Sequence, residues 1–166
     1  MVNPAEDIVN IWLQEVKDHF TMSNIVVRKG KGSRGGRGKE IDLLSTKNKE
    51  YFWIEVSVSP NPRLPNKSHR LQEITKNAID KFANEKSGYL GGRFPRQLFK
   101  KWFVYSPKLF GKKSDERNQY CEALKRHDIT PIAFDKILNE LSEKLDYMGY
   151  DTTRNYLFLL KKFLYK

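Results

Sequence analysis

Two acidic residues lie inside neighbouring apolar segments of this 166-residue chain. Asp42 follows Ile41 and precedes two leucines, and Glu55 lies in the middle of the segment YFWIEVSV. A carboxylate in such surroundings is costly to bury unless a cation neutralises it. Mg²⁺ prefers oxygen ligands and keeps several waters, so two carboxylates and a main-chain carbonyl can hold it. We therefore predict an Mg²⁺ (or Mn²⁺) site formed by Asp42, Glu55 and the carbonyl of Val56.

A cation held by a few carboxylates suits one reaction class in particular, the hydrolysis of phosphodiesters. Such a cation makes a bound water nucleophilic near neutral pH and offsets the charge that develops on the phosphate. The two carboxylates would supply the ligands and the phosphate would complete the site. Phosphodiester hydrolysis is thus the chemistry that these residues suggest.

The elements that carry the two carboxylates are predicted to be adjacent strands. The segment 50–58 alternates with a period of two, which is typical of a strand. One face would carry Phe52, Ile54, Val56 and Val58, and the other Tyr51, Trp53, Glu55, Ser57 and Ser59. A strand at about 40–46 precedes it across a polar turn at 47–49. This hairpin would bring Asp42 and Glu55 close together.

Basic charge is in excess and is unevenly distributed. The chain has 31 Lys+Arg against 20 Asp+Glu, a formal net charge of +11, and segments 28–39 and 86–114 contain no acidic residue. Segregated positive charge favours a polyanionic partner, most often nucleic acid. The loop 30–38 is rich in glycine and arginine, and the start of a helix near residue 68 would attract anions. The residues predicted to contact phosphates are Lys31, Arg34, Arg37, Lys39, Lys67, His69 and Arg70.

The remaining segments predict an α/β domain in which helices flank a mixed sheet. Asn3 and Pro4 are typical of a helix start, and Glu6 follows the cap by three residues. Alternation of later strands with helices indicates parallel crossovers. Helices are predicted at 3–20, 68–86, 114–127, 135–147 and 152–164, further strands at 24–28, 101–106 and 129–134, and loops at 30–38 and 88–96.

This order of elements and its short motifs resemble the PD-(D/E)xK nuclease superfamily, which has the restriction-endonuclease-like fold. The closest resemblance is to archaeal Holliday junction resolvases and related small nucleases, over roughly the first half of the chain. The matching features are Glu6, the loop 30–38, Asp42 in EIDLL and Glu55 in WIEVS. The resemblance implies one nuclease-like domain over residues 1–166, with an αβββαβ core at 1–134 and a C-terminal helical extension at 135–166.

The resemblance also implies catalytic roles for Asp42, Glu55, Glu6 and the residue at position 57. That residue is a lysine in the family pattern and is thought to help position the attacking water, but here it is Ser57. A serine cannot supply positive charge. Lys39 and Lys76 are candidates to replace it, and the sequence does not choose between them. Glu6 has the simpler alternative role of capping its own helix.

Three functions remain open at this point. The first is an Mg²⁺-dependent DNA endonuclease, and the resemblance implies structured or branched DNA as its substrate. The second is a DNA-binding protein that keeps the nuclease fold without effective cleavage, which Ser57 favours. The third is a basic RNA-binding protein, although no grouped stacking aromatics support it.

The resemblance further implies a homodimer. Leu157, Leu160 and Leu164 of the last predicted helix could form its interface, or the two C-terminal helices could simply cover a face of the sheet. The single cysteine, the absence of a basic and apolar leader and the lack of an apolar run of about 20 residues predict a cytoplasmic protein with no membrane partner.

Overall fold

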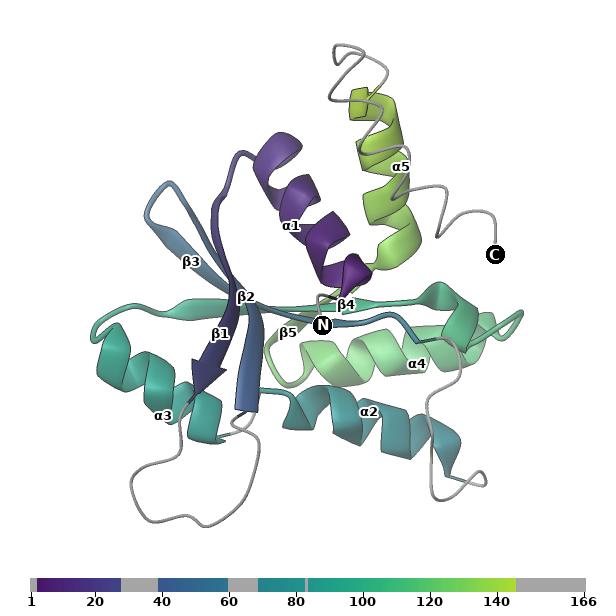
Figure 1. The fold of residues 1–166 in the computed structure, drawn as a ribbon. Coiled ribbons are helices and arrows are strands. Elements are labelled where there is room, and N and C mark those ends of the chain that lie inside the picture. The colour runs from purple at the N-terminus through teal and green to yellow at the C-terminus, as the bar shows by residue number, and fades with distance from the viewer. Residues whose placement is uncertain (1–2, 28–38, 60–68, 83, 146–166) are drawn as a thin grey trace.

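The computed structural model describes residues 3–27, 39–59, 69–82 and 84–145. Its centre is a five-stranded sheet whose strands lie side by side in chain order (Figure 1). The first three strands pair antiparallel, and the last three pair parallel through helical crossovers. The strands are β1 (Phe20–Val27), β2 (Lys39–Lys47), β3 (Glu50–Ser57), β4 (Phe99–Tyr105) and β5 (Ile129–Ala133). The predicted α/β architecture with a mixed sheet is confirmed.

Helices cover both faces of this sheet (Figure 1). On one face lie α1 (Pro4–Glu15) and α5 (Phe134–Leu145), and on the other lie α2 (Arg70–Asp80), α3 (Asn84–Arg93) and α4 (Ser114–Lys125). A short 3-10 helix, η1 (Pro107–Leu109), precedes α4. Strand β3 contributes to both cores: Phe52, Ile54 and Val56 to the α1/α5 core and Trp53 to the α2/α3/α4 core. The predicted alternation of β3 is therefore confirmed.

The first helix begins as predicted but ends early. The Asn3 side chain accepts a hydrogen bond from the Ala5 amide, so it is the N-cap. The helix ends at Glu15 instead of residue 20, and β1 already begins at Phe20. Asp18 has a φ of 55°, a left-handed conformation that breaks the helix. Lys47 Nζ then donates to the carbonyl of Lys17 and fastens this turn to β2.

The segment predicted as one helix over 68–86 and a loop over 88–96 forms two helices instead. Helix α2 ends at Asp80, and α3 then runs to Arg93 through Gly88, Gly91 and Gly92. Glycine disfavours a helix by about 1 kcal/mol per residue, which is why the sequence predicts a loop. The packing of Leu90, which is buried in the α2/α3/α4 core, outweighs that preference.

Helix α5 confirms the helix predicted from residue 135, and it belongs to the core. Phe134, Ile137, Leu138 and Leu141 are buried together with residues of α1. Covering a face of the sheet, the simpler alternative for this helix, is what α5 does (Figure 1). The helix predicted at 152–164 lies outside the described residues, so the dimer interface stays a prediction. Within the described ranges, no helix is long and apolar enough to cross a membrane.

Candidate functional site

Asp42 interrupts the regular pairing of β2. The register between β2 and β3 runs from Lys47 opposite Glu50 to Leu43 opposite Ile54, and there the paired positions end. Beyond that point the Asp42 side chain replaces the backbone pairing, because its Oδ2 accepts a hydrogen bond from the Val56 amide at 2.7 Å. The carboxylate is buried, and the hydrogen bond keeps Oδ2 against the backbone of β3. Asp42 therefore lies beside Glu55, as the hairpin predicted.

Glu55 is fully buried, and its two carboxylate oxygens differ in their hydrogen bonds. Its Oε1 accepts two hydrogen bonds, from Trp53 Nε1 at 2.6 Å and from Lys86 Nζ at 2.7 Å. Its Oε2 is the buried side-chain atom without a hydrogen-bond partner in the part of the chain that the structure describes. Burial, and then the charge of Asp42, raise the pKa of Glu55 to about 7. One oxygen of this carboxylate is thus held firmly, and the other remains an acceptor without a donor.

The side chain that joins the two carboxylates is Lys81, directly after α2. Its Nζ lies 3.3 Å from Asp42 Oδ2, 3.9 Å from Glu55 Oε2 and 3.1 Å from the carbonyl oxygen of Val56. These are the three residues predicted to bind a metal ion. In this structure their oxygens surround one ammonium group.

A second lysine, Lys86 of α3, completes the charge balance. Its Nζ is almost inaccessible and contacts Glu55 Oε1. Two ammonium groups therefore face two carboxylates in a largely buried setting. Sequence reasoning missed both lysines, because they follow Glu55 by 26 and 31 residues and reach it only through the packing of α2 and α3.

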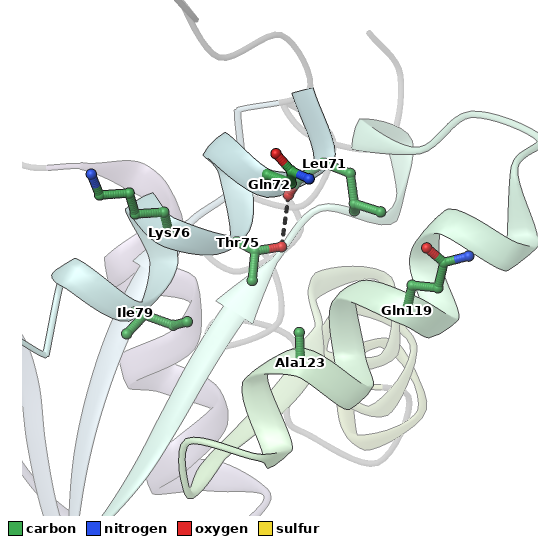
Figure 2. A pocket seen from close by; sticks show the side chains of 7 residues that line it. All are labelled: Leu71, Gln72, Thr75, Lys76, Ile79, Gln119 and Ala123. Carbon is green, nitrogen blue, oxygen red and sulfur yellow. Dashed lines mark hydrogen bonds between the residues drawn. The ribbon is translucent and has the colours of Figure 1, made fainter. Parts of the chain in front are cut away.

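Of the two lysines suggested from sequence, Lys76 lies on another surface. Lys76 is exposed and lies at a groove of about 440 Å³ between α2 and α4, together with Leu71 and Ala123 (Figure 2). Its amine points away from Gln119 and Ala123 of α4 (Figure 2). Lys39 is exposed at the first residue of β2. Lys76, one of the two open candidates, is therefore not the lysine at the carboxylates, since Lys81 lies there and Lys76 lies on another surface.

Glu6 serves its helix and also lies near the site. Its Oε1 accepts a hydrogen bond from the Asn3 side chain at 2.6 Å, which supports the capping role. With the Asn24 amide turned so that its nitrogen faces the carboxylates, that nitrogen lies 3.3 Å from Glu6 Oε2 and 3.1 Å from Glu40 Oε1. Burial and the nearby charge of Asp42 raise the pKa of Glu6. The two roles considered for Glu6 are therefore compatible.

Ser57 is exposed at the end of β3 and does not touch the carboxylates through any hydrogen bond seen in the described residues. It lines a cavity of about 80 Å³ that Lys81, Asn77 and Ser59 also line. Ser57 and the Lys81 side chain therefore lie on the wall of the same cavity.

The predicted phosphate contacts are only partly in view. Lys31, Arg34, Arg37 and Lys67 lie outside the described residues. His69 is exposed just before α2. Arg70 is half-buried, and its guanidinium donates to the carbonyl of Leu109, which fastens α2 to η1. Arg70 thus has a structural contact that the sequence did not suggest.

The residues present fit a hard divalent cation. Within the described ranges, no group of three or more His, Cys, Asp or Glu side chains is arranged to hold a metal ion. The convergent donors are instead two carboxylates and a carbonyl, which is enough for an ion that keeps several waters. Glu55 Oε2, which has no hydrogen bond among the described residues and only a long ion pair with Lys81, is a buried acceptor that a cation would satisfy.

Comparisons with known proteins add little to this geometry. No protein-family model and no curated protein sequence matches the chain. A solved structure titled "Crystal Structure of Protein of Unknown Function AF1548" is similar at 18% identity with a TM-score of 0.44. The match covers 80% of this chain and 59% of that one, so this chain spans about three-fifths of its length.

Proposed function

We propose that this protein is an Mg²⁺-dependent DNA endonuclease with a restriction-endonuclease-like core of the PD-(D/E)xK type. One observation carries the proposal: oxygens of Asp42, Glu55 and Val56 surround a single cationic position, which is taken by the Lys81 amine. Nothing in ordinary packing requires two buried carboxylates and a carbonyl to meet at one point. A site for a hard cation explains why they do.

The residues of the chain have distinct parts in this proposal. Asp42 and Glu55 would hold the Mg²⁺, with Val56 contributing its carbonyl, and the bound ion would activate water and offset charge on the phosphate. The Val56 amide fixes the Asp42 carboxylate, and Trp53 with Lys86 fixes that of Glu55. Lys81 brings the positive charge that Ser57 cannot supply, from the residue that follows helix α2 instead of from β3.

The substrate class follows from charge. The net charge of +11 and the acid-free segments support a polyanion, and the metal chemistry supports a phosphodiester within it. DNA, including branched DNA, is the substrate that we propose from the resemblance to junction resolvases, together with a homodimer that would cut two equivalent strands.

Cleavage of labelled duplex, single-stranded and four-way-junction DNA in Mg²⁺ or Mn²⁺ tests the proposal. We expect cleavage of at least one substrate and its loss, by about a hundredfold or more, in Asp42→Asn and Glu55→Gln. Chelation should abolish the activity and added Mn²⁺ should restore it. Equal products from the wild type and Asp42→Asn would refute the enzymatic proposal.

A second candidate function has its own supporting observation. Lys81 and Lys86 already balance the charges of Asp42 and Glu55, so the cluster is stable as an internal ion-pair network. That favours a DNA-binding protein that needs no metal. It predicts DNA binding that weakens steeply with salt and is unchanged by chelation. Calorimetric titration with Mn²⁺ separates the two, because only the nuclease should take up the ion.

A further inference from the structure

The two lysines at the carboxylates are held very differently. Lys86 is buried, and its Nζ is bound to Glu55 Oε1, which also accepts from Trp53. The Lys81 side chain is 35% exposed and stands immediately after the last residue of α2. A lysine with a flexible four-carbon stem can move its amine into water at little cost when part of it is already there. Lys86 is a fixed partner and Lys81 is a movable one.

The movable amine occupies the position that a cation would need. Its Nζ contacts Asp42 Oδ2 and the Val56 carbonyl, and it faces Glu55 Oε2 at 3.9 Å. An ammonium and a divalent ion cannot share this point, since they would overlap and like charges at such distances repel strongly. Any cation that binds these oxygens must therefore displace Lys81.

The surroundings provide a place for the displaced amine. Lys81 lines the cavity of about 80 Å³ at the ends of β3 and β4, where Ser57, Ser59 and Asn77 also contribute to the wall. These three polar side chains can hydrogen-bond an ammonium group, and the rest of the wall is mainly apolar and can pack against the lysine stem. A lysine at position 57 would bring a second cation to the same wall, whereas Ser57 leaves room for Lys81.

We propose that Lys81 is a built-in counter-cation of this site, which neutralises Asp42 and Glu55 in the free protein and yields its position to the divalent ion. This inference rests on the proposed function, because it needs the ion to bind. It adds that Lys81 weakens ion binding even though it contributes to the reaction. Removing its charge should therefore change ion affinity and cleavage in opposite directions.

Calorimetric titration of the full chain with Mn²⁺ tests this, using Lys81→Met and the matched control Lys76→Met on the same helix. We expect Lys81→Met to bind Mn²⁺ about fivefold more tightly than the wild type, as for the loss of a partly exposed charged competitor. Lys76→Met should bind like the wild type, because Lys76 is exposed on another surface. Lys81→Arg keeps the charge and should not bind more tightly.

Thermal unfolding supplies a second readout that does not depend on activity. Without metal, Lys81→Met should unfold at a lower temperature than the wild type, because two buried carboxylates lose a counter-charge. Saturating Mn²⁺ should raise its melting temperature by more than that of the wild type. If Lys81→Met does not fold, Lys81→Gln takes its place, since it removes the charge but keeps a polar side chain that can hydrogen-bond water or the cavity wall.

The outcomes distinguish this inference from the proposed function. Mn²⁺ binding by the wild type with equal or weaker binding by Lys81→Met would overturn the counter-cation role and leave the nuclease proposal standing. An absence of Mn²⁺ binding in the wild type and in every Lys81 variant would overturn both. Binding by Lys81→Met alone would also overturn both, because Lys81 would then exclude the ion from the wild-type site and not yield to it.

Discussion

The two faces of the sheet each bury titratable side chains, and they do so in different ways. On the α1/α5 face, His19 pairs with Ser45 Oγ at 2.9 Å and packs against Phe52 and Trp102, with ring centroids 4.8 Å and 5.9 Å away. On the α2/α3/α4 face, Asp42 and Glu55 meet two lysines, and one carboxylate oxygen has no hydrogen bond. The first arrangement is neutral and satisfied, and the second is charged and incomplete.

This difference distinguishes the structural His19–Ser45 pair from the candidate site at Asp42 and Glu55. Burial lowers the pKa of His19, so its imidazole is favoured in the neutral form, which suits an aromatic cluster. Burial raises the pKa of Glu55 and so favours its protonated form, whereas the neighbouring lysines favour the ionised form. Neither protonation state is therefore fully stabilised. Titratable groups whose pKa is strongly shifted by their surroundings are typical of functional sites.

The largest expected effect comes from Lys86. Lys86→Met leaves the buried Glu55 carboxylate without its closest counter-charge, and breaking a buried ion pair costs about 3–5 kcal/mol. Urea unfolding above pH 7, where Glu55 with its pKa of about 7 is ionised, measures the loss in the free energy of unfolding. The double variant Lys86→Met/Glu55→Leu should recover most of it, because the pair is then replaced by apolar groups. A loss below about 1 kcal/mol in the single variant would contradict a buried ionic contact.

The pH dependence of stability should reveal Glu55. The folded protein keeps a proton on this carboxyl up to about pH 7, whereas the unfolded chain releases it near 4.5. The free energy of unfolding should therefore fall by about 3 kcal/mol as pH rises from 4.5 to 7, from this group alone. The difference between wild type and Glu55→Gln in chemical unfolding isolates the effect. Parallel pH profiles for the two proteins would show that Glu55 is ionised throughout.

A smaller effect is expected at the neutral pair. Ser45→Ala removes the hydrogen-bond partner of the His19 ring while leaving its aromatic contacts. An unpartnered buried polar group costs about 1–3 kcal/mol, so Ser45→Ala should lose about that much stability by urea unfolding. Since the pair lies on the other face, Mn²⁺ affinity and DNA cleavage should be unchanged. A change in the Mn²⁺ affinity or in DNA cleavage would show that the two faces are energetically coupled.

The His19 ring should respond to acid in the opposite sense to Glu55. Its pKa is lowered in the folded protein, so the unfolded chain takes up the proton first as pH falls below about 6.5. The contribution of His19 to stability is present above that pH and is lost as pH decreases through it. Proton NMR of the imidazole should show a pKa below the ordinary value. A value above it would mean that the ring is charged inside the aromatic cluster.

The smallest effect is expected at an exposed ion pair. Lys100 and Glu50 join neighbouring strands but both side chains are more than half exposed. Exposed pairs contribute about 0–1 kcal/mol, so Lys100→Met should change stability little. It is the matched comparison for Lys86→Met, since both variants remove one lysine from one glutamate. Similar losses in the two would mean that burial does not decide the strength of these contacts.

Local patterns predicted the parts of the fold that depend on local physics. The alternation in β3 placed Glu55 opposite Phe52, Ile54 and Val56, because successive side chains of a strand must point to opposite faces. The N-cap at Asn3 was predictable for a similar reason, since it satisfies amides one turn away. The pairing of the strands that carry Asp42 and Glu55 follows from a short turn between them.

The predictions from sequence were wrong where tertiary packing outweighed the local conformational preference of the chain. Three glycines predicted a loop where α3 forms around the buried Leu90. The helix that was expected to continue to residue 86 stops at Asp80, and this break is what allows Lys81 and Lys86 to approach Glu55 from two separate helices. No spacing in the sequence marks such an approach, because it depends on the angle between elements.

The sequence by itself therefore determined the mixed α/β class, the two carboxylates and their adjacent strands, since each depends on periodicity and charge within a few residues. Only the tertiary structure decided which cations meet those carboxylates. Lys81 and Lys86 meet the carboxylates, and Lys76 does not. The reasons are the side of α2 on which each lysine lies, the break between α2 and α3, and the cost of burying an unpaired carboxylate. The identity of an acid in a strand is a local property, and the identity of its counter-charge is a property of the packed molecule.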